Sequence, residues 1–137
     1  MIRRILALIL SALIIPALIL LDGCKKQPSS VGMQQVSDSL KSAGFALDNF
    51  RPIDASAYGA QTCAAGPIGG VDTLVCEYPS PNGPAAGHAA AERWIGEAVT
   101  GAVLVNGLTL LAVADRGHAD PNGKTIHKIT QAYQKTR

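Results

Sequence analysis

A long apolar run occupies the start of the chain. Two arginines precede 17 residues without a charge, from Ile5 to Leu21. A basic start followed by an apolar run is the layout of a bacterial secretory signal. Because a membrane-spanning helix needs about 20 apolar residues, this run is slightly short for one. The pattern predicts a signal peptide over residues 1–23 and leaves an uncleaved membrane anchor as the alternative.

Three later segments carry apolar residues at the spacing of one helix face. The first ends at Gly44, and a glycine commonly stops a helix. The second covers residues 85–99 and is rich in alanine. The third follows Asp120 and Pro121, which suit a helix cap and a first-turn proline. The apolar stripes of these helices are Val36, Leu40 and Ala43; Ala91, Trp94, Ile95 and Ala98; and Ile126, Ile129 and Tyr133.

Alternation of apolar and polar residues predicts the strands. Residues 71–78 alternate clearly and end at the turn sequence PSPNGP, residues 79–84. Residues 45–50 alternate less clearly and predict a further strand. Residues 52–60 contain a proline and a glycine and are expected to form a loop. The three glycines and the proline of residues 64–70 predict a turn.

Residues 102–114 carry the clearest strand signal. Asn106 and Gly107 separate two strand-like runs, and both residue types tolerate the positive φ angles of a type I′ turn. A two-residue loop at this place pairs Val105 with Leu108. Both faces of the predicted hairpin are apolar: Val103, Val105, Leu108, Leu110 and Ala112 lie on one, and Ala102, Leu104, Thr109, Leu111 and Val113 on the other.

The predicted element order is helix, strand, strand, helix, strand, strand, helix, or αββαββα. Strands joined by hairpins with helices between the pairs predict an α+β fold, a small two-layer sandwich whose antiparallel sheet of about four strands has helices on at least one face. The domain is expected to cover residues 36–137, a usual length for a single core.

The second apolar face of the hairpin has two interpretations. If all helices pack on the other face, Leu104, Leu111 and Val113 form an exposed patch, which soluble monomers seldom keep without a use. The patch would then bind a protein partner or a second copy in a homodimer. If instead the terminal helix crosses to this face, the three residues are ordinary core. The sequence leaves both interpretations open.

The apolar run ends in Leu21-Asp22-Gly23-Cys24. These residues resemble the lipobox of bacterial lipoproteins, an aliphatic residue followed by two mostly small residues and an invariant cysteine. Leu21, Gly23 and Cys24 match the pattern, and Asp22 departs from it. The resemblance implies that the Cys24 thiol receives a diacylglyceryl group and that a peptidase cuts just before it. The alternative is an unmodified cysteine of the leader.

A lipidated cysteine would attach the protein to a membrane. One acyl chain holds a protein only marginally, whereas two or more anchor it stably. After Cys24, the polar residues up to residue 35, with Pro, Ser and Gly among them, predict a flexible tether with a reach of about 20 Å. The residue after the lipobox cysteine is Lys25, not the aspartate that retains enterobacterial lipoproteins in the inner membrane. The expected location is therefore the outer membrane, facing the periplasm.

Two further cysteines, Cys63 and Cys76, lie in the predicted domain. Exported domains fold in an oxidising compartment, so the simplest expectation is a disulfide between them. Cys76 lies in the strand over residues 71–78, where it can brace the strand that carries Cys63. Closing a loop of this length stabilises a fold by about 3 kcal/mol in the chain-entropy model.

The charge balance excludes a dedicated nucleic-acid surface. Of 12 Lys and Arg residues, two precede residue 24, and of 10 Asp and Glu residues only Asp22 does, so the remainder carries 10 basic and 9 acidic groups. Phosphate binding needs clustered Lys and Arg. The only adjacent basic pair in this part, Lys25-Lys26, is expected to be a solvated start of the tether.

The sequence contains no catalytic motif. No serine lies in a Gly-x-Ser-x-Gly elbow, and the domain cysteines are assigned to a disulfide, so neither an enzyme nor a cofactor is predicted. His88, His118 and His127 are too far apart for a His-Glu-x-x-His site. The expected function is a lipid-anchored cell-envelope protein with a non-catalytic binding or structural domain. The alternative is a periplasmic metal-binding or metal-sensing lipoprotein that uses His118 and His127, with Asp120 as a further ligand.

Overall fold

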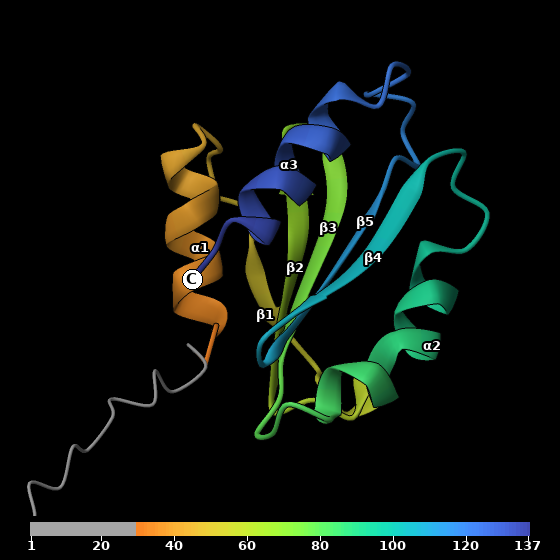
Figure 1. Ribbon diagram of the computed structural model, residues 1–137. Helices are drawn as coiled ribbons and strands as arrows, with labels where there is room; N and C mark the ends of the chain where they lie inside the picture. Colours follow the sequence, from red (N-terminus) through yellow and green to blue (C-terminus); the bar gives the residue numbers. More distant parts are fainter. Residues whose placement is uncertain (1–29) are drawn as a thin grey trace, which may run out of the picture.

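The computed structural model describes residues 30–137. The predicted signal peptide, Cys24 and the first residues of the predicted tether lie outside the described residues. Within them, three α-helices, one short 3-10 helix and five strands follow one another (Figure 1). They are α1 (Met33–Ser42), β1 (Arg51–Ile53), η1 (Ser56–Tyr58), β2 (Thr62–Ile68), β3 (Val71–Glu77), α2 (Gly83–Ile95), β4 (Gly101–Asn106), β5 (Thr109–Ala114) and α3 (Lys124–Gln134).

All five strands form one antiparallel sheet in the order β1-β2-β3-β5-β4. The predicted α+β class is confirmed, and the sheet has five strands rather than about four. The hairpins β2–β3 and β4–β5 lie side by side because β3 pairs with β5. The chain passes through α2 between the two hairpins, which leaves β1 and β4 as the edges of the sheet.

The folded domain begins before residue 36. Val31 is only 2% exposed, and its carbonyl accepts the N–H of Leu108 at 3.1 Å. The N–H of Met33 donates to the carboxylate of Glu77. Residues 31–35 therefore belong to the domain rather than to the predicted tether. They enter it at the end of the sheet where β4 turns into β5.

The first part of the sheet differs from the prediction. Residues 45–50 contain no strand, and β1 lies just after them, overlapping the start of the predicted loop over residues 52–60. The predicted turn over residues 64–70 is much shorter, because β2 continues to Ile68. Three strands rather than two therefore separate α1 from α2.

A two-residue turn is sufficient to join β2 and β3. Gly69 and Gly70 have φ angles of 60° and 88°, and the pair Ile68 and Val71 closes the hairpin. Such positive φ angles strain any residue with a side chain and suit glycine. Pro67 is opposite Asp72 of β3, but Ile68 and Val71 close the hairpin as a hydrogen-bonded pair, so the nitrogen of Pro67 faces the other side. On that side β1 pairs only with Cys63–Ala65, so no strand needs an N–H from the proline.

The register of the second hairpin also differs from the prediction. The turn consists of Gly107 and Leu108, and Val105 pairs with Leu110 rather than with Leu108. Asn106 stays in the strand, since its side-chain amide donates to the carbonyls of Tyr133 at 2.9 Å and Thr136 at 3.1 Å. These bonds, which join residues far apart in sequence, move the turn by one position. Leu108 leaves the first predicted face for the turn. The other residues keep their faces, because the partner of Val105 moves by two positions, from Leu108 to Leu110, and a two-residue shift preserves the alternation.

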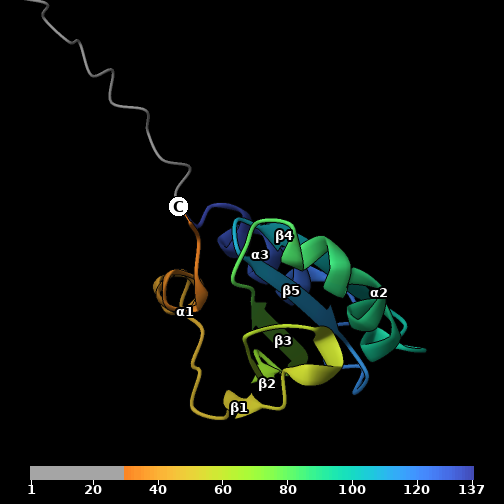
Figure 2. The same cartoon turned by 90° about the horizontal axis from the view of Figure 1, so that it is seen from below.

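Helices cover both faces of the sheet. Figure 2 shows α1 and α3 on one side and α2 on the other. Leu111 and Val113 are fully buried under α1 and α3, and Leu104 packs against the same cluster. The terminal helix thus crosses to the second apolar face, as one of the two interpretations expected, and the arrangement has helix layers on both sides rather than two layers in all.

The side chain of Tyr133 ties α3 to this hairpin. It is fully buried, and its hydroxyl lies 2.9 Å from Thr109 Oγ1 and donates to the Thr109 carbonyl at 2.8 Å. Burial raises the pKa of Tyr133 to about 12. The hydroxyl therefore keeps its proton at neutral pH and remains a hydrogen-bond donor.

Candidate functional site

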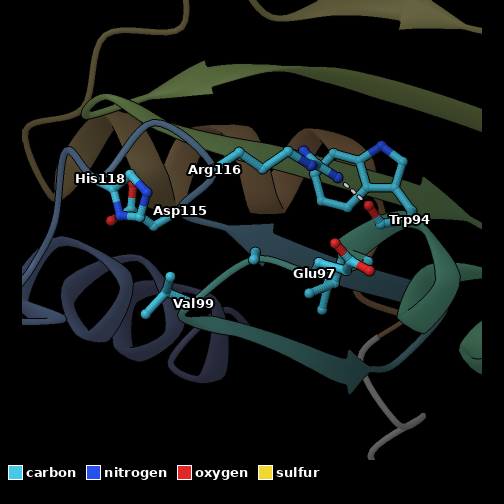
Figure 3. Close-up of a pocket in the computed structure, with 9 residues that line it drawn as sticks. Trp94, Glu97, Val99, Asp115, Arg116 and His118 are labelled. Atoms are coloured by element: carbon cyan, nitrogen blue, oxygen red, sulfur yellow. Dashed lines mark hydrogen bonds between the residues drawn. The ribbon is translucent and has the colours of Figure 1, made fainter.

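An open cavity of about 260 Å³ lies at the end of the sheet opposite the entry of the N-terminal segment. Its walls are the end of α2, the link from α2 to β4, and the segment after β5 (Figure 3). We call it the distal pocket. Its lining residues are Trp94, Ile95, Gly96, Glu97, Ala98, Val99, Asp115, Arg116 and His118.

One wall forms because α2 stops abruptly. Gly96 has a φ of 61° and donates its N–H to the carbonyl of Glu92 at 3.2 Å, the arrangement of a glycine at a helix C-terminus. The chain then turns toward β4, and the carbonyl of Thr100 accepts the N–H of Asp115 at 2.9 Å. Between these two points, Val99 is 75% exposed, the most exposed large apolar side chain of residues 30–137.

Arg116 joins the two sides of the pocket. Its guanidinium carbon lies 4.3 Å from the centre of the Trp94 ring, within the range of a cation–π contact. One terminal nitrogen donates to the carboxylate of Asp72 at 2.9 Å, and the other donates to the carbonyl of Trp94. A single side chain therefore connects the end of α2 with β3, and Figure 3 shows it lying across the indole.

Two buried aspartates hold the segment after β5. The carboxylate of Asp115 accepts the N–H groups of Ala119 at 2.8 Å and Asp120 at 2.9 Å. The carboxylate of Asp120 accepts those of Thr125 at 3.0 Å and Ile126 at 2.8 Å, in the first turn of α3. Burial acts to raise the pKa of Asp120, but these donors outweigh it and lower that pKa below its usual value. The carboxylate of Asp120 thus satisfies N–H groups in the first turn of α3, but the N-cap residue is Gly123, and Pro121 precedes the helix, which begins at Lys124, rather than lying in its first turn.

His118 has an uncommon backbone conformation. Its φ is 54°, and it is the only non-glycine residue with a positive φ among residues 30–137. Such conformations cost free energy and persist where the surrounding structure holds them, often at functional sites. The bonds from Asp115 to the two residues that follow His118 supply that restraint. The imidazole lines the distal pocket on the side away from Trp94 (Figure 3).

The predicted disulfide is confirmed. Cys63 and Cys76 are directly opposite each other in the pairing of β2 with β3, with Cα atoms 4.1 Å apart, and their sulfurs are bonded. Both are buried beneath η1 and α2, at 3% and 0% exposure. The bond braces the hairpin on the face opposite α1 and α3.

The histidines do not lie in a common site. His118 lines the distal pocket, His127 is exposed on α3, and His88 on α2 lies 3.4 Å from the carboxylate of Glu92. Asp120, the third candidate ligand, uses its carboxylate to cap α3. Within residues 30–137, no three His, Cys, Asp or Glu side chains come close enough together to hold a metal ion.

Sequence reasoning missed the pairing that builds the pocket. Trp94 was expected only as part of an apolar helix stripe, and Arg116 lies 22 positions later in the chain. No spacing or motif connects the two residues. Their contact arises because β5 runs antiparallel to both β3 and β4, which brings the segment after β5 to the end of α2.

Comparisons with known proteins give no assignment. No family model matches the chain, and neither curated proteins nor solved structures contain a significant match. Among residues 30–137, no helix combines the length and apolar character needed to cross a membrane.

The contact between Arg116 and Trp94 can be tested by fluorescence, because the chain contains one tryptophan. We expect Arg116→Ala to expose the indole to water and shift its emission to longer wavelength. The cost in stability should be below about 1 kcal/mol, since the ion pair with Asp72 is exposed to solvent. Arg93→Ala serves as a control: Arg93 lies on α2 next to Trp94, and its replacement should leave the emission unchanged. An unchanged spectrum in Arg116→Ala would contradict the stacking.

Proposed function

We propose that this chain is a lipoprotein of the bacterial cell envelope, anchored through Cys24, whose domain is a non-catalytic binding module. The observation that carries the proposal is the buried disulfide between Cys63 and Cys76. Disulfides form and persist in oxidising compartments and are rare in the cytosol. A disulfide in the domain is consistent with the predicted export signal at the start of the chain. The lipobox-like residues 21–24 lie between that predicted signal and the domain.

The position of the distal pocket suits a protein attached at its N-terminus. The N-terminal segment enters beside Gly107, at the turn between β4 and β5. The pocket lies at the other end of the same strands, next to Gly101 and Ala114. Anchoring through Cys24 would therefore leave the pocket open. The outer membrane, facing the periplasm, is the location we propose.

The chemistry of the pocket favours binding over catalysis. Trp94 and Val99 supply apolar surface, while Arg116 and His118 supply a few polar groups, a combination typical of ligand sites. Two of the charged groups are occupied in structural roles: Arg116 bonds Asp72 and Trp94, and Asp115 holds its own loop. A catalytic acid or base would need to exchange protons with a substrate, and these partners oppose that.

Metabolic labelling tests the anchor. Cells that express the full chain and receive an alkyne fatty acid should yield labelled wild-type protein, whereas Cys24→Ser should carry no label. The reason is that only the Cys24 thiol, and the amine that cleavage exposes, would accept acyl chains. The double variant Cys63→Ser/Cys76→Ser controls for the other sulfurs and should keep the label. Equal labelling of wild type and Cys24→Ser would refute the lipoprotein assignment.

A further inference from the structure

All four lysines of residues 30–137 lie in one layer of the fold. They are Lys41 on α1, Lys124 and Lys128 on α3, and Lys135 at the C-cap of α3. Of the nine acidic residues in this part of the chain, only Asp38 lies on these two helices. Figure 2 shows α1 and α3 on the same side of the sheet, with α2 on the other. A chain that is nearly balanced in charge therefore carries a basic face, the outer side of α1 and α3.

Three of these lysines follow one side of α3. Lys124, Lys128 and Lys135 are spaced by four and seven residues, which brings them to the same side of a helix. The spacing does not stabilise α3, because the helix dipole disfavours a cation in the first turn, where Lys124 lies, and Lys128 repels it. Among residues 30–137, both ion pairs involve histidine or arginine, so no lysine is neutralised by a carboxylate. The lysines are thus left to attract an anion from outside the domain.

A groove between α1 and α3 gathers hydrogen-bond donors beside these lysines. Its volume is about 340 Å³, and its lining includes Ser42 of α1, Lys128 and Gln131 of α3, and Lys135. We call it the lysine groove, and none of its lining residues is acidic. The Lys128 ammonium lies 5.1 Å from the centre of the Phe45 ring, a cation–π contact that restrains it beside the groove. Ammonium, hydroxyl and amide groups together suit the oxygens of a phosphate group.

The N-terminal segment enters the fold at one end of the lysine groove. Val31 packs against Gly107, where an added Cβ atom would meet the Val31 nitrogen at 2.8 Å. The amide of the neighbouring Asn106 bonds the carbonyl of Thr136 at 3.1 Å, next to Lys135. Lys135 and the start of the folded domain therefore lie at the same end of the molecule.

An anchor at Cys24 would keep a membrane close to this end. Val31 follows Cys24 by seven positions, so a fully extended chain spans at most about 25 Å between them. Two more lysines, Lys25 and Lys26, come directly after the cysteine. A membrane that holds Cys24 would thus lie within reach of the Lys135 end of the groove.

We propose that the basic face docks on a membrane rich in anionic phospholipid, with headgroup phosphates in the lysine groove. Such membranes attract lysines close to their surface and can thereby orient a tethered domain. The opposite layer contributes Glu92 on α2 and Glu97 just after it, which the same surface repels. The docking rests on the proposed function, because the anchor at Cys24 brings the face to the membrane. The distal pocket, at the end of α2, is then directed away from the membrane.

Acylation of lysines tests the docking. The full chain is bound to vesicles of phosphatidylcholine, with or without phosphatidylglycerol, and mass spectrometry follows the reaction of each lysine. With phosphatidylglycerol, Lys124, Lys128 and Lys135 should react at least about threefold more slowly, because a negative surface keeps amines protonated and contact shields them. Raised salt should restore the rates, since it screens the surface charge. Arg93→Lys places a matched lysine on α2, which should react equally in both vesicles. Equal rates for the three lysines in both vesicles, or the same slowing at position 93, would overturn the docking.

Removing charges separates the docking from the anchor. Lys128→Gln/Lys135→Gln keeps exposed polar side chains and should abolish the slowing at Lys124. Arg51→Gln/Arg93→Gln removes two exposed charges outside the basic face and should preserve it. Slowing at Lys124 that survives in the lysine double variant would contradict the docking.

Flotation with phosphatidylcholine vesicles reports the anchor alone. If the chain does not float with them, the anchor is refuted, and flotation with vesicles that contain phosphatidylglycerol then tests the basic face. The unanchored wild type should float with these vesicles, and Lys128→Gln/Lys135→Gln should not. Absence of wild-type flotation, or equal flotation of the unanchored wild type and this variant, would rule out the docking.

Discussion

Leu111→Ala should lower the free energy of unfolding by about 2 to 5 kcal/mol. Leu111 is fully buried in β5 and packs in the cluster that α1 and α3 form with the sheet. Removing most of its side chain loses buried apolar contact and leaves a cavity that a sheet between two helix layers cannot close easily. Urea unfolding of the purified chain at constant pH measures the change.

Leu104→Ala is the matched control for this prediction. Leu104 pairs directly with Leu111 and lies on the same face, but it belongs to the edge strand and is only partly buried. Its loss should be clearly smaller, about 1 to 2 kcal/mol at 25 cal/mol per Å² of buried apolar area. Equal, small losses at both positions would mean that this face is not core.

Reducing the disulfide should lower stability by about 3 kcal/mol, through the wider range of conformations that the unfolded chain gains. For a domain of this size, that loss corresponds to a melting temperature lower by about 10 to 20 °C. Because Cys63 and Cys76 are buried, complete reduction is verified by mass spectrometry under denaturing conditions before the melting scan.

The double variant Cys63→Ala/Cys76→Ala separates the disulfide from side effects of the reductant. It should melt near the reduced wild type, and adding reductant should not change its melting temperature further. Protein taken from the cell envelope, the location proposed above, should show Cys63 joined to Cys76 in non-reducing mass spectrometry. Two freely alkylated thiols in such protein would contradict the disulfide in its native compartment.

The helices and the faces of the second hairpin followed from the sequence. A helix face repeats every 3.6 residues and a strand face every two, so the stripe of Ile126, Ile129 and Tyr133 and the two faces of residues 102–114 could be assigned before any partner was known. The disulfide could also be predicted, because the leader-like start of the chain led us to expect export, and two cysteines in the domain allow one pairing. These features depend on local pattern or on compartment, which a sequence carries.

Strand β2 and the register of the β4–β5 hairpin could not be predicted from the sequence. Residues 62–68 have little alternation, and they form a strand because β3 supplies hydrogen bonds along their whole length. Asn106 and Gly107 suit a type I′ turn, yet the amide of Asn106 bonds the end of α3, and the turn moves to Gly107 and Leu108. In both places, contacts from distant residues outweighed the local preference, which is worth only about 1 kcal/mol.

What the sequence by itself determined is therefore the class of the fold, its apolar faces and the disulfide, because each follows from periodicity or from residue type. Only the tertiary structure decided that α3 and α2 cover opposite faces, that Arg116 stacks on Trp94, and that β4 lies at an edge of the sheet. Those features depend on the order of strands in space. That order is set by which faces become buried together across the whole chain, and no local segment contains this information.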